Sequence, residues 1–251
     1  MEFAGPGMPG IVVLMDTRDG MVQTLMEPAA TWWRTLASTG DPAAAARAAN
    51  LSATEATGLT RALTAAGFLT TTTTTRPAPW PALIVGLDPG PSWGSQTAPV
   101  ALPKHPPSRR ALRATAFLVM AAVLTITRCG SHHRYFDRHL KAVRAVAHWN
   151  ALRHAPFADP ATAAESVDAV RRAARWCPAR AVCLEQATAA MVLLALRGHS
   201  ATWCQGIAPD PVRLHAWIEH TDSGEPVDEP ADTAAYTTVL RIPGRRSPSR
   251  T

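Results

Sequence analysis

The second half of the chain holds, in order, the residue types of an enzyme that uses a cysteine nucleophile: Cys183, then His215, then the acidic pair Asp228 and Glu229. A thiolate can attack a carbonyl carbon, and a histidine can take up the thiol proton. A carboxylate can hold the imidazole in the tautomer that this proton transfer requires. This order predicts acyl-transfer chemistry through a covalent intermediate. A small buried core thiol is the alternative for Cys183 taken alone.

Cys183 is expected in the first turn of a buried helix. The segment that starts at Leu184 is almost entirely apolar after Gln186, Gly198 closes it, and Pro178 keeps the helix from starting much earlier. In the first turn of a helix, unpaired N–H groups and the positive end of the dipole favour a thiolate. The same amides can stabilise an oxyanion, so the position suits a nucleophile.

His215 is expected on a strand over residues 214–219, after a first strand over 201–207. Alternation puts His215, Trp217 and Glu219 on one face of that strand. A hairpin turn at 222–224 would then return the chain antiparallel to the strand. The returning residues would bring an acid beside the imidazole.

Two acids compete for the place beside His215, because only alternate residues of a returning strand face the ring. Asp228 has the shorter reach and the more rigid side chain, and an orienting carboxylate works best when it is rigid. We therefore favour Asp228 on these grounds and retain Glu229 as the alternative.

The first 70 residues have the pattern of a small winged-helix-like domain. Residues 11–15 and 21–25 read as two strands joined at Asp19-Gly20, a strong hairpin signal. Three short helices follow, over 28–40, 41–49 and 52–67, with Asp41 and Ser52 as N-caps and Glu55 completing a capping box. Leu59, Leu63 and Ala66 would line the apolar face of the third helix.

Residues 71–107 are expected to be a Thr/Pro-rich linker. They continue a run of six threonines and hold nine prolines, which forbid a continuous helix or a central strand. Only residues 82–87 are apolar enough to dock on a neighbour. Residues 108–251 form the second domain, which begins with helices over 109–155 and includes a short helix over 166–175.

The segment Ala114–Thr127 is apolar around its whole circumference, which predicts a buried helix. It is too short for a membrane span, which needs about 20 residues. Residues 1–5 lack the basic stretch that opens a signal peptide. Four cysteines are too few for a disulfide scaffold, so we expect a cytoplasmic protein with reduced thiols.

The net charge of +6 comes from one segment: residues 104–153 carry 10 basic and 1 acidic side chains, a net +9. Such a run usually marks a solvated helix face, and a nucleic-acid binder would spread its basic residues over its recognition elements. The cysteines and histidines match no zinc spacing, so we expect no metal.

The N-terminal pattern resembles the PqqD-like recognition domain of peptide-modifying enzymes. The resemblance rests on Asp19-Gly20, residues 28–30, Gly40-Asp41, Leu63 and residues 67–69. It implies that a leader peptide binds as an added strand between the last strand and the third helix, with Val22, Thr24, Leu59 and Leu63 as candidate contacts. The alternative is a DNA-binding winged helix, but the third helix carries one arginine and one glutamate and so lacks a basic recognition surface.

The C-terminal pattern resembles the transglutaminase-like cysteine proteases of lasso-peptide biosynthesis, the B proteins. The matching stretches are 183–185, 193–198, 215–219 and 224–227. The resemblance implies that Cys183 is the nucleophile, that His215 is the base, and that the family's acid falls on Glu229. It also implies ATP-stimulated processing with an asparagine-synthetase-like lasso cyclase as partner, and no covalently bound cofactor.

The sequence thus predicts an α+β protein with an N-terminal winged-helix-like domain and a C-terminal papain/transglutaminase-like domain. The expected function is leader peptidase: it would bind a precursor peptide, cut off the leader and pass the core peptide to a macrolactam cyclase. We expect no nucleic-acid or membrane partner. A transglutaminase-type acyl transferase with the same triad, and a non-catalytic leader-binding scaffold, are the alternatives.

Overall fold

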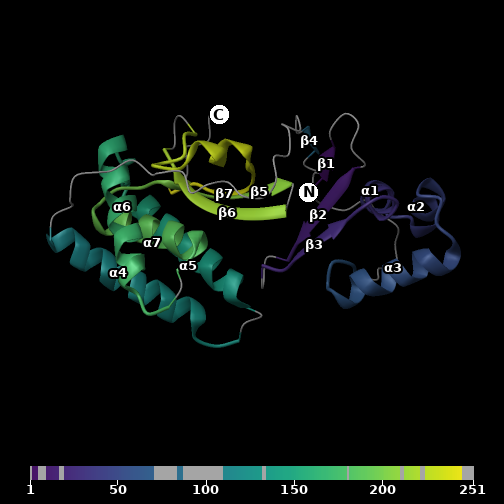
Figure 1. The fold of residues 1–251 in the computed structure, drawn as a ribbon, viewed down its shortest axis with the longest axis horizontal. Helices are drawn as coiled ribbons and strands as arrows, with labels where there is room; N and C mark the ends of the chain where they lie inside the picture. Colours follow the sequence, from purple (N-terminus) through teal and green to yellow (C-terminus); the bar gives the residue numbers. More distant parts are fainter. Residues whose placement is uncertain are drawn as a thin grey trace. The chain divides into compact units, whose positions relative to one another are not determined.

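A computed structural model of the chain shows helices and sheets grouped in two compact units, Met1–Ser92 and Trp93–Thr251 (Figure 1). The mixed helices and sheets agree with the predicted α+β class. The structure describes residues 2–4, 10–16, 20–70, 84–86, 110–131, 134–179, 181–209, 212–220 and 224–244.

The sheet of the first unit contains the two predicted strands and two that were not predicted. β2 (Ile11–Met15) pairs antiparallel with β3 (Val22–Leu25), and the Asp16 N–H donates to the Met21 carbonyl at 2.9 Å beside the turn. Residues 17–19 of the predicted turn lie outside the described residues. β1 (Glu2–Ala4) and β4 (Ile84–Gly86) extend the sheet to the order β3-β2-β1-β4.

β4 corrects the expectation for residues 71–107. Ile84–Gly86 pairs in parallel with β1, so part of the expected linker belongs to the sheet of the first unit. The first unit accordingly extends to Ser92. β4 falls within residues 82–87, the part of the expected linker that is apolar enough to dock on a neighbour. So short a strand becomes stable only through its pairing partner.

The three short helices are α1 (Ala29–Thr39), α2 (Pro42–Ala48) and α3 (Ala53–Ala65). α1 ends at Gly40, whose φ of 70° suits glycine. The N-caps are the expected ones: Asp41 accepts from the Ala43 N–H, and Ser52 and Glu55 form a capping box, each cap contributing about 1 kcal/mol. The core beneath these helices is formed by Val12, Leu14, Leu25, Ala30, Trp32, Ala45, Ala49 and Leu63.

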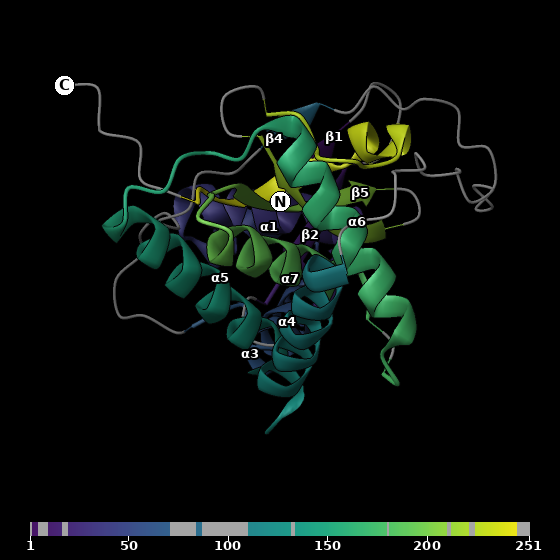
Figure 2. The same cartoon turned by 90° about the vertical axis from the view of Figure 1, so that its left-hand side faces the viewer.

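The second unit is built around α7 (Cys183–Leu196). This helix packs against α4 (Arg110–Arg128), α5 (Tyr135–Leu152) and α6 (Pro160–Trp176), and against the sheet (Figure 2). A helix that is apolar on all sides is stable in a protein only when other elements cover it on all sides. α7 is such a helix, and its side chains from residue 187 to 195 are nearly all buried.

The α6 helix begins at Pro160, six residues before the predicted start at Ser166. Asp159 caps it by accepting from the Thr162 N–H at 2.9 Å, and Pro160 occupies the first turn, where the missing N–H costs nothing.

The α4 helix is buried along one face only, which corrects the expectation of burial all round. Val119, Met120 and Val123 are buried, whereas Leu118 is 68% exposed and Ile126 is 59% exposed. By length and composition α4 could cross a membrane, and it is the one such helix in the part of the chain that the structure describes. A core helix meets the same two criteria.

The sheet of the second unit has the order β6-β5-β7 and is antiparallel throughout. Its strands are β5 (Thr202–Pro209), β6 (Val212–Glu219) and β7 (Thr237–Ile242). After β6 the chain returns through a single bridge between Glu219 and Pro226 and then passes through a 3-10 helix, Ala231–Ala235, to reach β7. Residues 221–223 of the predicted turn lie outside the described residues.

Candidate active site

Cys183 is the first residue of α7, as predicted, and is partly exposed. The Val182 N–H donates to Glu185 Oε2 at 3.0 Å, and the first helical bond runs from the Gln186 N–H to the Val182 carbonyl. The amides of Cys183 and Leu184 therefore lie in the first turn, where a helix offers its N–H groups no carbonyl partner. This arrangement can bind negative charge that develops next to the thiol.

The carboxylate of Glu185 holds the start of α7 in place through hydrogen bonds. It is 1% exposed, and its Oε1 accepts from the Tyr135 hydroxyl at 2.5 Å and from Arg128 at 3.1 Å. His139, behind Tyr135, shares a hydrogen bond of 3.1 Å with Thr188, and burial lowers the pKa of His139 to about 4. The contacts of the buried Glu185 carboxylate hold the turn that carries Cys183.

Two aromatic rings flank the His215 ring on β6. Trp217 stacks on it with ring centroids 5.8 Å apart, and Tyr236 lies tilted at 5.2 Å. The Trp217 indole N–H donates to Glu219 at 2.9 Å, so the predicted face of His215, Trp217 and Glu219 is present. These contacts leave the imidazole little freedom to rotate.

Gly206 makes room for this packing from the neighbouring strand. It lies opposite His215 in the β5–β6 register. A Cβ atom at residue 206 would lie 2.5 Å from the Trp217 ring and 3.0 Å from the Tyr236 Cβ. Any side chain there would displace the Trp217 ring that packs on His215.

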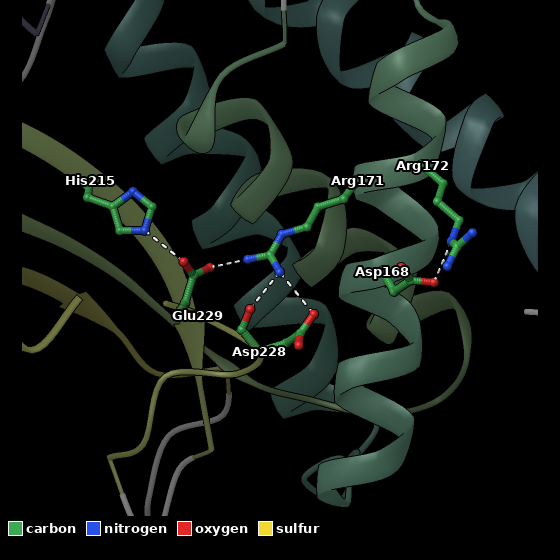
Figure 3. A network of polar contacts seen from close by, with 6 residues as sticks. All are labelled: Asp168, Arg171, Arg172, His215, Asp228 and Glu229. Atoms are coloured by element: carbon green, nitrogen blue, oxygen red, sulfur yellow. Dashed lines mark hydrogen bonds and ion pairs between the residues drawn. The ribbon is translucent and has the colours of Figure 1, made fainter. Parts of the chain in front are cut away.

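Glu229, and not Asp228, contacts His215. Glu229 Oε2 lies 2.9 Å from His215 Nε2 (Figure 3). The preference for Asp228 is therefore wrong as to position. Asp228 has a φ of 54°, in the left-handed region, and its carboxylate contacts Arg171 of α6 at 2.9 Å. The chain turns at residues 227–228, so strand alternation ends before the acids.

The imidazole contacts the Glu229 carboxylate directly and interacts electrostatically with the Cys183 thiol. Because Nε2 faces Glu229, Nδ1 is left to face Cys183. Burial alone would lower the pKa of His215, but hydrogen bonds to Cys183 and Glu229 and the charges of both outweigh it and raise the pKa to about 9. Cys183, His215 and Glu229 thus form one cluster, here called the cysteine–histidine–glutamate cluster.

A small cavity adjoins this cluster, between α6, α7 and β6. Its volume is about 40 Å³, and it is lined by Val167, Val170, Arg171, Cys183, Gln186, Ala187, Ala190, His215, Ala216, Trp217, Ile218 and Glu229. On this measure, about 10–15 Å³ is enough to hold one water molecule. The cavity has room for a water molecule and is far too small for a peptide, so a substrate would have to approach the exposed side of Cys183.

The other cysteines stand apart from the cluster. Cys204 is buried, Cys129 is exposed, and Cys177 at the end of α6 is partly buried. Within the described ranges, no three His, Cys, Asp or Glu side chains gather as a metal site would require.

The four candidate leader contacts lie in the first unit. Thr24 is exposed, and Val22 and Leu59 are partly buried. Leu63 is 1% exposed and belongs to the core, so it has no surface to offer a peptide, and its assignment as a leader contact is corrected. β3 stands at the end of the strand order, which leaves its outer edge without a neighbour among the described strands.

Sequence reasoning missed Arg171 and Tyr236. For Arg171 a signal existed: it follows Val167 by four residues and Val170 by one, so it falls on the buried stripe of its helix. A guanidinium on a buried stripe needs a carboxylate partner. For Tyr236, whose place depends on the path from β6 to β7, the sequence offered no comparable signal.

The comparisons with known proteins agree with this geometry. The family model described as the Transglutaminase-like superfamily matches residues 123–241. Neither the curated proteins nor the solved structures gave a match. The matched range runs from within α4 to β7 and includes every residue of the cysteine–histidine–glutamate cluster. Residues 123–241 are therefore a transglutaminase-like superfamily domain, of a class that generally comprises cysteine proteases and acyltransferases.

Proposed function

We propose that the protein is a cysteine peptidase that removes the leader from a ribosomally made precursor of the lasso-peptide type. The observation that carries the proposal is the cysteine–histidine–glutamate cluster, set at a helix N-terminus inside a transglutaminase-like domain. Each member has the chemical role that hydrolysis of a peptide bond requires.

In the proposed reaction, His215 takes the proton of Cys183 and the thiolate attacks the scissile carbonyl. The amides of Cys183 and Leu184 stabilise the oxyanion, and Glu229 stabilises the imidazolium. His215 then gives its proton to the leaving amine, and the leader remains as a thioester on Cys183. Water, deprotonated by His215, hydrolyses the thioester and regenerates the thiol.

The first unit is proposed to hold the leader on the outer edge of β3. A peptide that adds as a strand gains main-chain hydrogen bonds from such an edge and specificity from neighbouring side chains. Met21 and Met26, at the two ends of β3, are each 60% exposed and offer apolar contacts. Thr24 and Val22 on the strand and Leu59 on α3 complete the proposed contact set.

The resemblance to the lasso-peptide B proteins extends the proposal to the partners of the reaction. An asparagine-synthetase-like cyclase would consume the freed core peptide, and ATP would stimulate the coupled process. The protein would work in the cytoplasm without a nucleic-acid or membrane partner.

The test is incubation of the full chain with synthetic leader–core peptides of the lasso-precursor type. Mass spectrometry should find separate leader and core products. A leader joined to an added amine, with no hydrolysed leader, would assign the acyl transferase instead. Binding without any product would assign the non-catalytic scaffold.

Leader binding has its own prediction. Fluorescence anisotropy should give a Kd of about a micromolar for a labelled leader, as for a short strand in a groove. Thr24→Asp should weaken binding at least about tenfold, because it places a charge at the proposed interface. Thr57→Asp is the matched control, an exposed threonine of α3, and should bind normally. Equal affinities of the two variants would contradict the β3 site.

A further inference from the structure

We propose that Arg171 is a positioning residue that holds Glu229 against His215 by binding both members of the acidic pair at once. The inference rests on the proposed role of the cysteine–histidine–glutamate cluster. It concerns a residue of α6 that contacts neither the thiol nor the imidazole in any hydrogen bond of the described structure.

The contacts of Arg171 divide between its two terminal nitrogens (Figure 3). One, Nη1, donates to the carbonyl oxygen of Asp228 at 2.5 Å and to its carboxylate at 2.9 Å. The other, Nη2, donates to Glu229 Oε1 at 2.7 Å. A planar guanidinium fixes such a set of acceptors in direction as well as in distance.

The second oxygen of Glu229 is the one that contacts His215, at 2.9 Å. The carboxylate is therefore held from both sides, with one oxygen on Arg171 and the other on the imidazole. The side chains of Arg171, Asp228 and Glu229 are 14%, 4% and 9% exposed, so water screens this chain of contacts weakly.

In this arrangement the carboxylate of Asp228 serves to bind the Arg171 guanidinium. Its left-handed backbone, with φ of 54°, turns its carbonyl and carboxylate together toward Arg171. Asp228 would thus fix the guanidinium, the guanidinium would fix Glu229, and Glu229 would fix the imidazole. Loss of any link should weaken the imidazolium that keeps Cys183 reactive.

The test uses iodoacetamide, which alkylates a thiolate, so it reads the cluster without any peptide substrate. The rate of alkylation at Cys183 is followed by peptide mass mapping from pH 4 to 10, with the exposed Cys129 of the same chain as internal standard. In Arg171→Met, the rate at neutral pH should fall about tenfold or more, the effect typical of an outer-shell partner. The half-maximal rate should move to higher pH.

The matched control is Arg172→Met, which removes the same charge from the next residue of the same helix. Arg172 pairs with Asp168 one turn back, away from Glu229 (Figure 3). It should keep the wild-type pH profile. Arg171→Lys keeps the positive charge but loses the pair of terminal nitrogens that binds both acids. Its pH profile should lie between those of the wild type and Arg171→Met.

If Arg171 only stabilised the packing of α6 against residues 224–230, its substitution would lower the unfolding temperature and leave the pH profile of alkylation unchanged. That result in folded Arg171→Met or Arg171→Lys, shown by circular dichroism, would overturn the proposal. In a Glu229→Gln background, Arg171→Met should add little, whereas full additivity would also overturn it. Failure to cleave any precursor would count against the proposed function only, because the alkylation profile does not depend on it.

Discussion

Cys183→Ala is expected to abolish leader release while leaving the fold and leader binding intact. Removal of the nucleophile of a comparable triad lowers kcat by about 10⁶-fold, because the remaining groups cannot form the covalent intermediate. The side chain is small and partly exposed, so its loss creates no large cavity in the core. Initial rates of cleavage and circular dichroism spectra check both halves of the expectation.

The control for this prediction is Cys177→Ala, which removes another partly buried thiol from the end of α6. It should retain cleavage, because Cys177 makes no hydrogen bond to the cluster that the described contacts record. Normal cleavage by Cys183→Ala, or a loss shared equally by both variants, would contradict the assignment of the nucleophile.

Glu229→Gln is expected to slow cleavage by about 10²- to 10⁴-fold with binding unchanged, because the amide favours the wrong tautomer and cannot stabilise the imidazolium. The carboxylate helps raise the pKa of His215 to about 9, so its loss lowers that pKa. The alkaline limb of the pH–rate profile should therefore move below pH 9.

The same substitution should change stability in a defined pH range. The folded pKa of His215 lies above its ordinary value of 6.5, so protonated His215 stabilises the native state fully below about pH 6.5, and this contribution is lost as the pH rises through 9. The difference in unfolding free energy between wild type and Glu229→Gln should shrink over that range. A constant difference would contradict the charged contact.

Asp228→Asn provides the comparison between the two acids. Asparagine retains an acceptor oxygen for Arg171 and tolerates a left-handed φ, so the variant should lose only about tenfold in rate. A larger loss for Asp228→Asn than for Glu229→Gln would reverse their roles.

The local parts of the site could be predicted from sequence because each depends on one element. The start of α7 follows from the apolar run after Cys183, and the face of β6 follows from period-2 alternation through His215. The choice of acid could not be predicted in the same way. It depends on a left-handed turn at Asp228 and on Arg171, which is 57 residues away in the chain.

In the fold, too, features that depend on adjacent residues could be predicted, and those that depend on distant residues could not. The caps at Asp41 and Ser52 and the hairpin of β2 and β3 follow from adjacent residues, and the structure places them as expected. The place of β4 in the sheet cannot be predicted from its own three residues, because their hydrogen bonds come from β1, which is 82 residues earlier in the register. Short strands with distant partners leave no periodic pattern to detect.

The central claim is that Cys183 carries the leader as a thioester during catalysis. The most direct test mixes excess enzyme with the synthetic leader–core peptide, quenches in acid within the first turnover, and maps the covalent adduct by mass spectrometry. We expect an enzyme that is heavier by the leader less one water, with the adduct on the peptide that contains Cys183. Cleavage in the same samples with the adduct on another residue, or with no adduct at any quench time, would contradict it.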